Sequence, residues 1–289
     1  MRSLAFLLLA GWVAAACSLV SPPRTQAAEE LHFGVPPYLP ADELQFEFQP
    51  IVDYISKKTA VKTTLLITKD YADLGMQMAA GKVDIGYFTP FAYVEAAKAG
   101  GMELFLGTKY NGSYFYKGAI IVRKDRGITG LAGLKGKSFA FVDKQSASGY
   151  VYPRSLLADN GINPDDYFGR YSFEGNHTKV IRAVLAGDFD AGSVSSSALL
   201  DERAKGTPID ELLTLAETEP IPQDAIAVRS DLDADLKERV RYGLAEMSYT
   251  LEGKAILSKS RYGRGGFGPT TDKDFDVVRK AAGLLQPAG

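Results

Sequence analysis

Cysteine and histidine are nearly absent from this chain: its 289 residues include one cysteine and two histidines. The cysteine, Cys17, lies in an apolar leader, so the rest of the chain has no residues for a Cys/His zinc site, a disulfide framework or a thiol nucleophile. Positive charge is not in excess either, because 33 Lys and Arg residues face 35 Asp and Glu residues. That balance argues against a broad electrostatic hold on nucleic acid. A metal site built from carboxylates alone is not excluded by these counts.

Long apolar runs are also missing after the leader, where no segment approaches the roughly 20 apolar residues of a transmembrane helix. The composition is otherwise that of a folded globular protein, with 46% hydrophobic and 24% charged residues. Because domains usually span about 100–200 residues, a chain of 289 suits one large bilobed body or two compact domains.

The N-terminal residues 1–28 have the features of an export signal. Arg2 supplies the positive charge, and the apolar run Leu4–Ala16 is too short to span a bilayer core of about 30 Å. Cleavage after Ala27 would release a soluble protein, whereas a lipoprotein-like box at 14–17 would place a lipid on Cys17, although the preferred Leu three residues before it is missing. A retained apolar terminus on a cytoplasmic protein is a third interpretation. We expect the mature protein to act in the periplasm.

Strand and helix patterns alternate along the mature chain, which predicts an α/β class with largely parallel sheets. The expected strands include 31–35, 62–67, 83–88, 119–123, 138–142, 189–194 and 225–229. Helices are expected at 177–186 and, as one long amphipathic segment, at 231–251. The strands AIIVR at 119–123 and AIAVR at 225–229 are similar and about a hundred residues apart, as expected of a chain that enters a second lobe and returns; two unrelated core strands would look the same.

The strongest chemical signal is a strand, loop and helix over 138–157, with Ser146, Ser148 and Gly149 where the helix would begin. Unpaired N–H groups and a partial positive charge make a helix start an anion site, although serine also caps helices that bind nothing. His177 begins another helix and could donate to an oxyanion when charged. A serine hydrolase would need an orienting acid and is not supported by a Gly-x-Ser-x-Gly elbow.

Further polar candidates are scattered over loops. Tyrosines that follow strands could line a ligand cleft or simply cover the edges of a lobe: Tyr71, Tyr87, Tyr110, Tyr114 and Tyr116. Three aspartates resemble capping or turn residues more than a metal cluster: Asp84, Asp190 and Asp224.

Taken in order, several segments resemble the phosphate, phosphite and phosphonate family of periplasmic solute-binding proteins of ABC importers. The resemblance runs from about Leu31 to Ala282, and its segments are GKVDIGYFTPFAYVEA at 81–96, GLKGKSFAFVDKQSASGYVYPRSLL at 133–157, HTKVIRAVLAGDFDAGSV at 177–194, EPIPQDAIAVR at 219–229 and GFGPTTDKDFDVVRKAA at 266–282. Five motifs in the right order make it specific to the family.

The resemblance implies a two-lobed α/β fold of the type II periplasmic binding class, with the strands at 119–123 and 225–229 as the hinge. The first lobe would hold 29–119 and 228–289, and the second 120–227. A ligand in the cleft would favour the closed form. The implied protein is a monomer and not an enzyme, needs no cofactor or metal, and passes its ligand to an ABC permease in the inner membrane or signals to a sensor kinase.

The resemblance also implies a ligand site. Ser146 and Ser148 match the two serines of the family's Ser-Thr-Ser-Gly segment, and Ala147 replaces its threonine, so one hydroxyl donor is missing while the backbone N–H remains. His177 matches a histidine that contacts the oxyanion, and Asp224 an acidic residue that could accept from a protonated oxyanion or pair with an amine. Three tyrosines complete the expected site: Tyr116, Tyr71 and Tyr87.

Departures from the family pattern bear on the cargo. Members that bind aminoalkylphosphonates place an acid near the end of the 189–194 strand, where this chain has Ser195, Ser196 and Ser197. An amine would therefore lack one counter-charge, which favours phosphite, phosphate or a small alkylphosphonate. Relatives that capture arsenite use a cysteine that the mature chain lacks, so arsenite is disfavoured.

Overall fold

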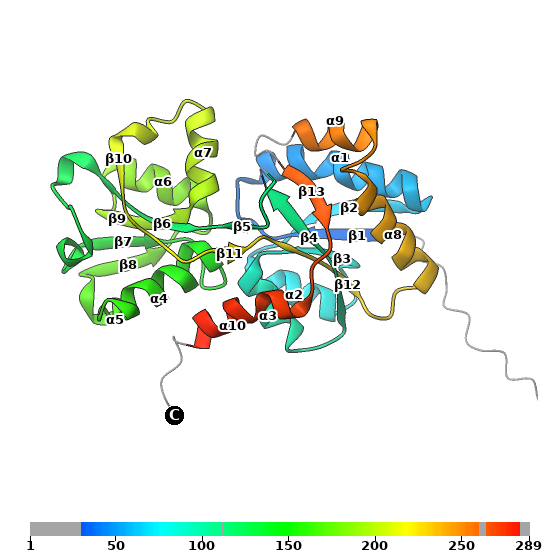
Figure 1. Ribbon diagram of the computed structural model, residues 1–289, viewed down its shortest axis with the longest axis horizontal. Helices are drawn as coiled ribbons and strands as arrows, with labels where there is room; N and C mark the ends of the chain where they lie inside the picture. The colour runs from blue at the N-terminus through cyan, green and yellow to red at the C-terminus, as the bar shows by residue number, and fades with distance from the viewer. Residues whose placement is uncertain (1–29, 111, 260–263, 284–289) are drawn as a thin grey trace, which may run out of the picture.

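Two α/β lobes lie side by side and are joined by a narrow connection, as Figure 1 shows. The computed structural model describes residues 30–110, 112–259 and 264–283. The expected leader over 1–28, with Cys17, lies outside these residues. Among the described residues, no helix combines the length and the apolar character needed to cross a bilayer.

The first lobe is built on a six-stranded sheet with the order β13-β4-β12-β3-β1-β2. Its strands are β1 (Glu30–Val35), β2 (Lys62–Ile67), β3 (Ile85–Phe88), β4 (Met102–Tyr110), β12 (Ala225–Arg229) and β13 (Arg264–Gly268). The helices that belong to this lobe are α1 (Ala41–Thr59), α2 (Tyr71–Ala79), α3 (Pro90–Ala97), α8 (Ala234–Glu246), α9 (Leu251–Lys259) and α10 (Asp276–Gly283), with a 3-10 turn η5 (Asp272–Phe275).

The second lobe is built on a five-stranded sheet with the order β10-β6-β9-β7-β8. Its strands are β6 (Gly118–Arg123), β7 (Ser138–Phe141), β8 (Arg170–Phe173), β9 (Ala191–Ser195) and β10 (Leu212–Glu217). Its helices are α4 (Tyr152–Asp159), α5 (Pro164–Tyr167), α6 (His177–Ala186) and α7 (Ser196–Ala204), with a π-helical turn η3 (Ala147–Val151) before α4 and 3-10 turns η1 (Lys124–Arg126), η2 (Leu131–Leu134) and η4 (Ile209–Glu211).

The α/β class is confirmed, but the prediction of largely parallel sheets is wrong. In the first lobe β1 is parallel to β2 and β3, whereas β12 is antiparallel to β3 and β4 and β13 is antiparallel to β4. In the second lobe β7 is parallel to β8 and β9, whereas β6 is antiparallel to β9 and β10. A strand that the chain forms after crossing between lobes enters the sheet from the other end, so it runs against its neighbours.

The chain crosses between the lobes at a small ribbon, not at the strands expected from the sequence. The ribbon consists of β5 (Phe115–Tyr116) and β11 (Ile221–Pro222), antiparallel to each other, and lies between the lobes in Figure 1. The strands at 119–123 and 225–229 lie within β6 and β12, each inside one sheet. The lobe limits expected at 119/120 and 227/228 therefore fall inside strands, a few residues after each crossing.

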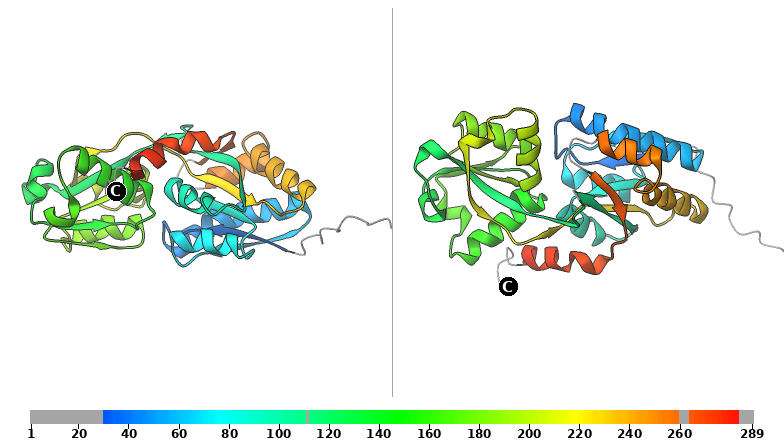
Figure 2. Two further views of the ribbon diagram at one scale, coloured as in Figure 1. Left: turned by 90° about the horizontal axis from the view of Figure 1, so that it is seen from below. Right: turned by 45° about the horizontal axis from the view of Figure 1, so that its top comes forward.

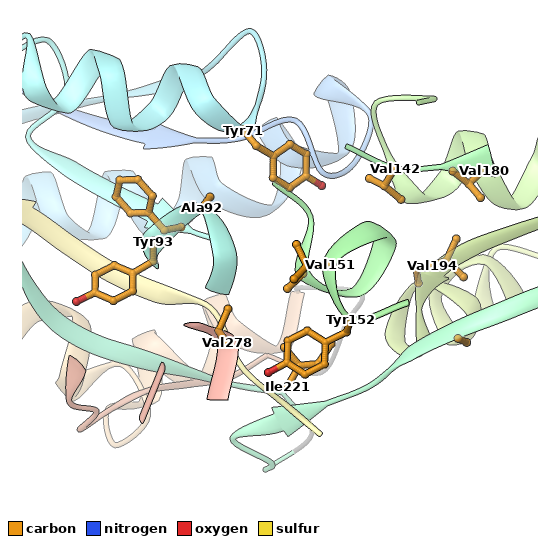
Figure 3. Close-up of a cluster of buried hydrophobic side chains, with 14 of the residues drawn as sticks. Tyr71, Ala92, Tyr93, Val142, Val151, Tyr152, Val180, Val194, Ile221 and Val278 are labelled. Carbon is orange, nitrogen blue, oxygen red and sulfur yellow. The ribbon is translucent and has the colours of Figure 1, made fainter. Parts of the chain in front are cut away.

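Apolar packing continues from one lobe into the other. One cluster of buried side chains contains Tyr71 of the first lobe, Val142 and Val151 of the second, and Ile221 of the ribbon, and Figure 3 shows these residues gathered at the junction. Helix α10 contacts both α3 and α4, so it lies across the junction, as both views of Figure 2 show. The junction therefore buries apolar surface that opening would expose.

The long helix expected over 231–251 is wrong, because the chain turns between α8 and α9. The Thr250 hydroxyl accepts the N–H of Gly253 at 3.0 Å, which starts α9 with its own cap. A Cβ on Gly253 would lie 2.3 Å from the Met247 Cα, so only glycine permits this tight return. The amphipathic spacing alone did not reveal the break.

Candidate functional site

A polar cleft between the lobes gathers most of the candidate residues. From the first lobe it is lined by Tyr38, Leu39, Tyr87, Thr89 and Tyr110, and near the ribbon by Tyr116, Gln223 and Asp224. From the second lobe it is lined by Ser146, Ser148, His177, Ser195, Ser197, Ala198 and Asp201. Six of the eight expected site residues therefore meet in one cleft, whereas Ala147 and Tyr71 are not part of its lining.

The segment that carries the two serines presents donors to the cleft. Ser146 precedes η3 and its hydroxyl oxygen accepts the N–H of Gly149 at 3.1 Å, so it caps this turn and keeps its own hydrogen for another acceptor. Ser146 and Ser148 are 2% and 1% exposed. The N–H groups of Ala147 and Ser148 stand at the start of the turn, where backbone donors lack helical partners. Capping and ligand binding, which the sequence left as alternatives, are compatible here.

Ala147 and Gly149 support this segment from behind. The Ala147 side chain belongs to the apolar cluster at the junction, so only its backbone can serve a ligand. A Cβ on Gly149 would lie 2.5 Å from the Cβ and Cγ2 atoms of Val142. The glycine therefore permits close packing against Val142, whereas the sequence suggested close approach of a ligand.

His177 enters the cleft as a neutral donor. It is the first residue of α6, and its Nδ1 accepts the N–H of Ser195 at 3.1 Å, which places the ring hydrogen on Nε2. Burial lowers the pKa of His177 to about 4, so the ring is uncharged near neutral pH, in contrast to the charged donor expected from the sequence. Because Nδ1 is occupied by a backbone N–H, no acid orients this ring as a hydrolase triad requires.

The first lobe and the ribbon add tyrosines and an acid. The Tyr87 hydroxyl donates to Asp224 at 2.5 Å, and the Tyr87 ring stacks on Tyr38 with 5.9 Å between ring centroids. Tyr116 is half-buried in β5; burial and then the Asp224 charge raise the pKa of its hydroxyl. Tyr71 starts α2 behind the cleft and is 1% exposed, and its hydroxyl has no hydrogen-bond partner among the described residues.

Asp201 is the acid that sequence reasoning missed. It lies on α7, is 8% exposed, and accepts a hydrogen bond from the Tyr110 hydroxyl at 3.1 Å. Burial raises the pKa of Asp201 to about 8; the Tyr110 hydrogen bond opposes this rise, and the nearby Glu47 carboxylate adds to it. Serines at 195–197 suggested that a ligand amine would lack a counter-charge. Asp201 places an acid one helical turn further along the chain.

The two other candidate aspartates, Asp84 and Asp190, have partners within their own lobes. Asp84 forms an ion pair with Arg229 at 3.0 Å and accepts the N–H of His32 at 2.8 Å. Asp190 accepts the N–H and the hydroxyl of Ser138 at 2.9 and 2.8 Å. Over the described ranges, no group of three or more His, Cys, Asp or Glu residues could hold a metal ion.

Direct contacts join the lobes across the mouth of the cleft. Lys205, at the end of α7, pairs with Glu43 of α1 at 2.5 Å and with Glu202 at 2.8 Å. The Tyr110 hydrogen bond to Asp201 also links the lobes. The structure therefore represents a closed arrangement of the cleft.

Comparisons with known proteins agree with this architecture. Residues 33–275 match the family described as periplasmic substrate-binding protein of a phosphonate ABC transporter. The chain is 28% identical to the phosphate-import protein PhnD of Mycolicibacterium smegmatis, over 92% of this chain and 90% of the relative, and 28% identical to the phosphonates-binding periplasmic protein of Escherichia coli, over 92% and 80%.

Solved structures share the fold. A binding protein component of an ABC phosphonate transporter from Pseudomonas aeruginosa superposes with a TM-score of 0.80 at 23% identity, covering 87% of this chain and 85% of that one. PhnD1 from Prochlorococcus marinus in complex with methylphosphonate gives a TM-score of 0.80 at 19% identity, covering 89% and 98%.

Proposed function

This chain belongs to the family of periplasmic substrate-binding proteins of phosphonate ABC transporters, and we propose how it recognises its cargo, a small phosphorus oxyanion destined for an ABC permease. The observation that carries the proposal is the set of donors converging from the second lobe. The hydroxyls of Ser146 and Ser148, the N–H groups that follow them and Nε2–H of His177 suit the oxygens of a tetrahedral oxyanion. The backbone of Ala147 belongs to this set.

The charge of the cleft restricts which oxyanion fits. Among the described residues, the cleft lining contains Asp201 and Asp224 but neither lysine nor arginine. The raised pKa of Asp201 keeps that carboxyl protonated near neutral pH, so a fully deprotonated dianion would face the Asp224 carboxylate without a counter-charge. The ligand therefore brings a hydrogen that Asp224 can accept. Phosphite, hydrogen phosphate and a small alkylphosphonate, each as the form with an O–H group, carry such a hydrogen. A ligand amine could take up the Asp201 proton and pair with the resulting carboxylate, so amine-bearing phosphonates return to the candidates. Sulfate carries none near neutral pH.

Asp224 is the proposed acceptor for that hydrogen. It already accepts from Tyr87 and lies beside the ribbon, where Tyr116 also lines the cleft. Tyr71 would turn its buried hydroxyl to the ligand after a small rearrangement, since that hydroxyl has no partner among the described residues. Asp224→Asn should weaken binding of a protonated oxyanion about 10-fold or more, and tighter binding would instead indicate charge repulsion.

Closure of two lobes couples recognition to transport. We propose that the two lobes, divided at the ribbon and so a few residues before the limits expected at 119/120 and 227/228, move about β5 and β11. A ligand that contacts both walls favours the closed form by its extra affinity for that form. The permease, or a sensor kinase as a different partner, would read this closed form.

A serine hydrolase is disfavoured by the geometry of His177. Its Nδ1 accepts from the backbone of Ser195, and no hydrogen bond joins its ring to Ser146 or Ser148 in the described part of the chain. Turnover of phosphate or carboxyl esters that disappears in Ser148→Ala would overturn this conclusion.

Export and processing follow from the leader. We propose cleavage after Ala27, which leaves all described elements intact because β1 begins at Glu30. Acylation of Cys17 is the alternative, and mass spectrometry of the exported protein distinguishes the two. We also propose that the protein is a monomer.

Calorimetric titration of the exported, processed protein, freed of carried-over ligand, tests the proposal. The panel is phosphite, phosphate, methylphosphonate, 2-aminoethylphosphonate, sulfate and arsenite. Micromolar or tighter binding of one phosphorus compound, with no binding of sulfate, is the expected result. If none of the phosphorus compounds binds, the proposed function is wrong.

A further inference from the structure

Thr89 is a helix-capping residue that does not cap its helix. It stands at the N-cap position of the eight-residue helix α3, yet its side chain makes no capping hydrogen bond. Elsewhere in the chain, Asp70, Asn176 and Ser195 each accept the N–H three residues on, at 2.8, 2.9 and 3.1 Å. A threonine that leaves the usual partner unused has its hydroxyl directed elsewhere.

The Thr89 hydroxyl lines the cleft without a partner. The residue is 8% exposed and belongs to the cleft lining, and its hydroxyl oxygen is buried with no hydrogen-bond partner among the described residues. Buried hydroxyls in native proteins are nearly always satisfied, so one that faces a cleft indicates a partner that arrives with the ligand.

The surroundings of Thr89 place it opposite the serine segment. In the first sheet Phe88 pairs with Ala225, so the next step along both chains brings Thr89 alongside Asp224. The first helical hydrogen bond of α3 runs from the Tyr93 N–H to the Thr89 carbonyl at 2.9 Å, which leaves the N–H groups of Phe91 and Ala92 before it at the helix start. Donors of the first lobe therefore stand beside the acid Asp224.

We propose that the Thr89 hydroxyl is the first-lobe donor to the same oxyanion that Ser146 and Ser148 hold from the second lobe. The inference rests on the proposed function. It accounts for the hydroxyl that is missing at Ala147, because Thr89 supplies one from the opposite wall. Since Thr89 and the serines belong to different lobes, an oxyanion that contacts all three binds completely only in the closed form.

A pair of substitutions at Thr89 tests this role. Thr89→Val keeps the shape and removes the hydroxyl, so affinity for the phosphorus oxyanion that binds the native protein should fall about 10- to 100-fold. Thr89→Ser keeps the hydroxyl and should bind within about 3-fold of the native protein. The melting temperature of ligand-free Thr89→Val should not fall, because no native hydrogen bond is lost. Thr64→Val, on the edge strand β2, is the control and should bind as the native protein does.

The outcomes separate this inference from the proposed function. Native-like affinity of Thr89→Val, with Ser148→Ala weakened, overturns the Thr89 contact and leaves the function standing. If Thr89→Ser and Thr89→Val lose affinity equally, or if ligand-free Thr89→Val has a lowered melting temperature, Thr89 has a packing role. Either result also overturns the proposed Thr89 contact. Failure of the native protein to bind phosphite, phosphate, methylphosphonate or 2-aminoethylphosphonate overturns the function and this inference together.

Discussion

The two walls of the cleft offer a ligand different chemistry. The second-lobe wall presents donors at the starts of η3 and α6, namely serine hydroxyls, backbone N–H groups and the neutral ring of His177. The wall of the first lobe and the ribbon presents tyrosines and Asp224, with Thr89 at the start of α3. Asp201 is the exception, because it belongs to the second lobe and pairs with Tyr110 of the first.

The proposed site would bind an anion without a cationic side chain among its described lining residues. Donors at segment starts are held by their own backbone, so they bind an oxyanion with little reorganisation. The carboxylate of Asp224 on the other side would then select among oxyanions, because only one that brings a hydrogen relieves its charge. On this proposal, affinity would depend mainly on the donors of the second lobe and discrimination among oxyanions on Asp224.

The largest loss of affinity is expected when the packing behind the 146–149 segment, which carries the serine donors, is disturbed. Gly149→Ala would place a Cβ 2.5 Å from Val142, so the 146–149 segment must move and affinity should fall about 100-fold or more. Gly130→Ala is the matched control, because a Cβ there meets nothing within 4 Å and the backbone is extended. Equal affinity of the two variants in calorimetry would contradict the packing role of Gly149.

Single donors come next. Ser146→Ala, Ser148→Ala and His177→Ala each remove one hydrogen bond to a charged ligand, which costs about 1.5–3 kcal/mol, or about 10- to 150-fold in affinity. Ser258→Ala on α9, whose hydroxyl donates only to Ala255 within its own helix, serves as the control. If all three variants bind as tightly as the native protein, the donor wall is wrongly placed while the fold stands.

The protonation state of Asp201 is tested by measuring the free energy of unfolding as a function of pH. The pKa of Asp201 is raised from 3.8 to about 8 in the folded protein, so the fold holds a proton that the unfolded chain releases. This group therefore lowers the free energy of unfolding progressively as pH rises from about 4 to about 8. Asp201→Asn removes the loss, so its free energy of unfolding relative to the native protein should increase over that window, by on the order of 5 kcal/mol at pH 8.

Urea unfolding at pH 4, 6 and 8 measures this difference. Asp188→Asn, at an exposed bend outside the cleft lining, is the control. A flat difference between Asp201→Asn and the native protein would show that the Asp201 carboxylate is ionised throughout.

The smallest loss of affinity is expected when the ion pair that joins the two lobes at the mouth of the cleft is weakened. Glu43→Gln weakens the ion pair with Lys205, which keeps Glu202 as a second partner, so affinity should fall only about 2- to 5-fold through a less favoured closed form. The exposed pair of Lys57 and Glu252 lies within the first lobe, so Glu252→Gln should leave affinity unchanged. Small-angle scattering of the ligand-free protein should show a more open average for Glu43→Gln alone.

Local sequence patterns correctly predicted those strands and helices whose form is decided by residues close together in the sequence. The strand Lys62–Ile67 and the helix His177–Ala186 have the expected bounds, because alternation and helical spacing are complete within each segment. The break between α8 and α9 and the antiparallel entry of β6 and β12 depend on packing against distant elements. Neither leaves a signal in the local pattern.

The candidate site divides in the same way. The chemistry of Ser146, Ser148 and His177 was readable from helix starts and family motifs, since capping residues and their motifs are local. Asp201 and Thr89 carried no such signal, because an acid on a helix and a threonine before Pro90 are ordinary until the fold turns them toward one cleft. The family pattern places an acid near the end of the 189–194 strand, and extending that search by one helical turn would have identified Asp201 as a candidate.

The amino-acid order alone settled the class of protein, the alternation of strands and helices, and the residue types available for binding. It also excluded a Cys/His zinc site, a disulfide framework and a thiol nucleophile, since the one cysteine lies in the leader. Only the tertiary structure decided that the chain crosses at the β5–β11 ribbon, that His177 is neutral, and that Asp201 and Thr89 share the cleft. Those properties arise from burial and from contacts between residues far apart in the chain, and no local sequence pattern encodes either.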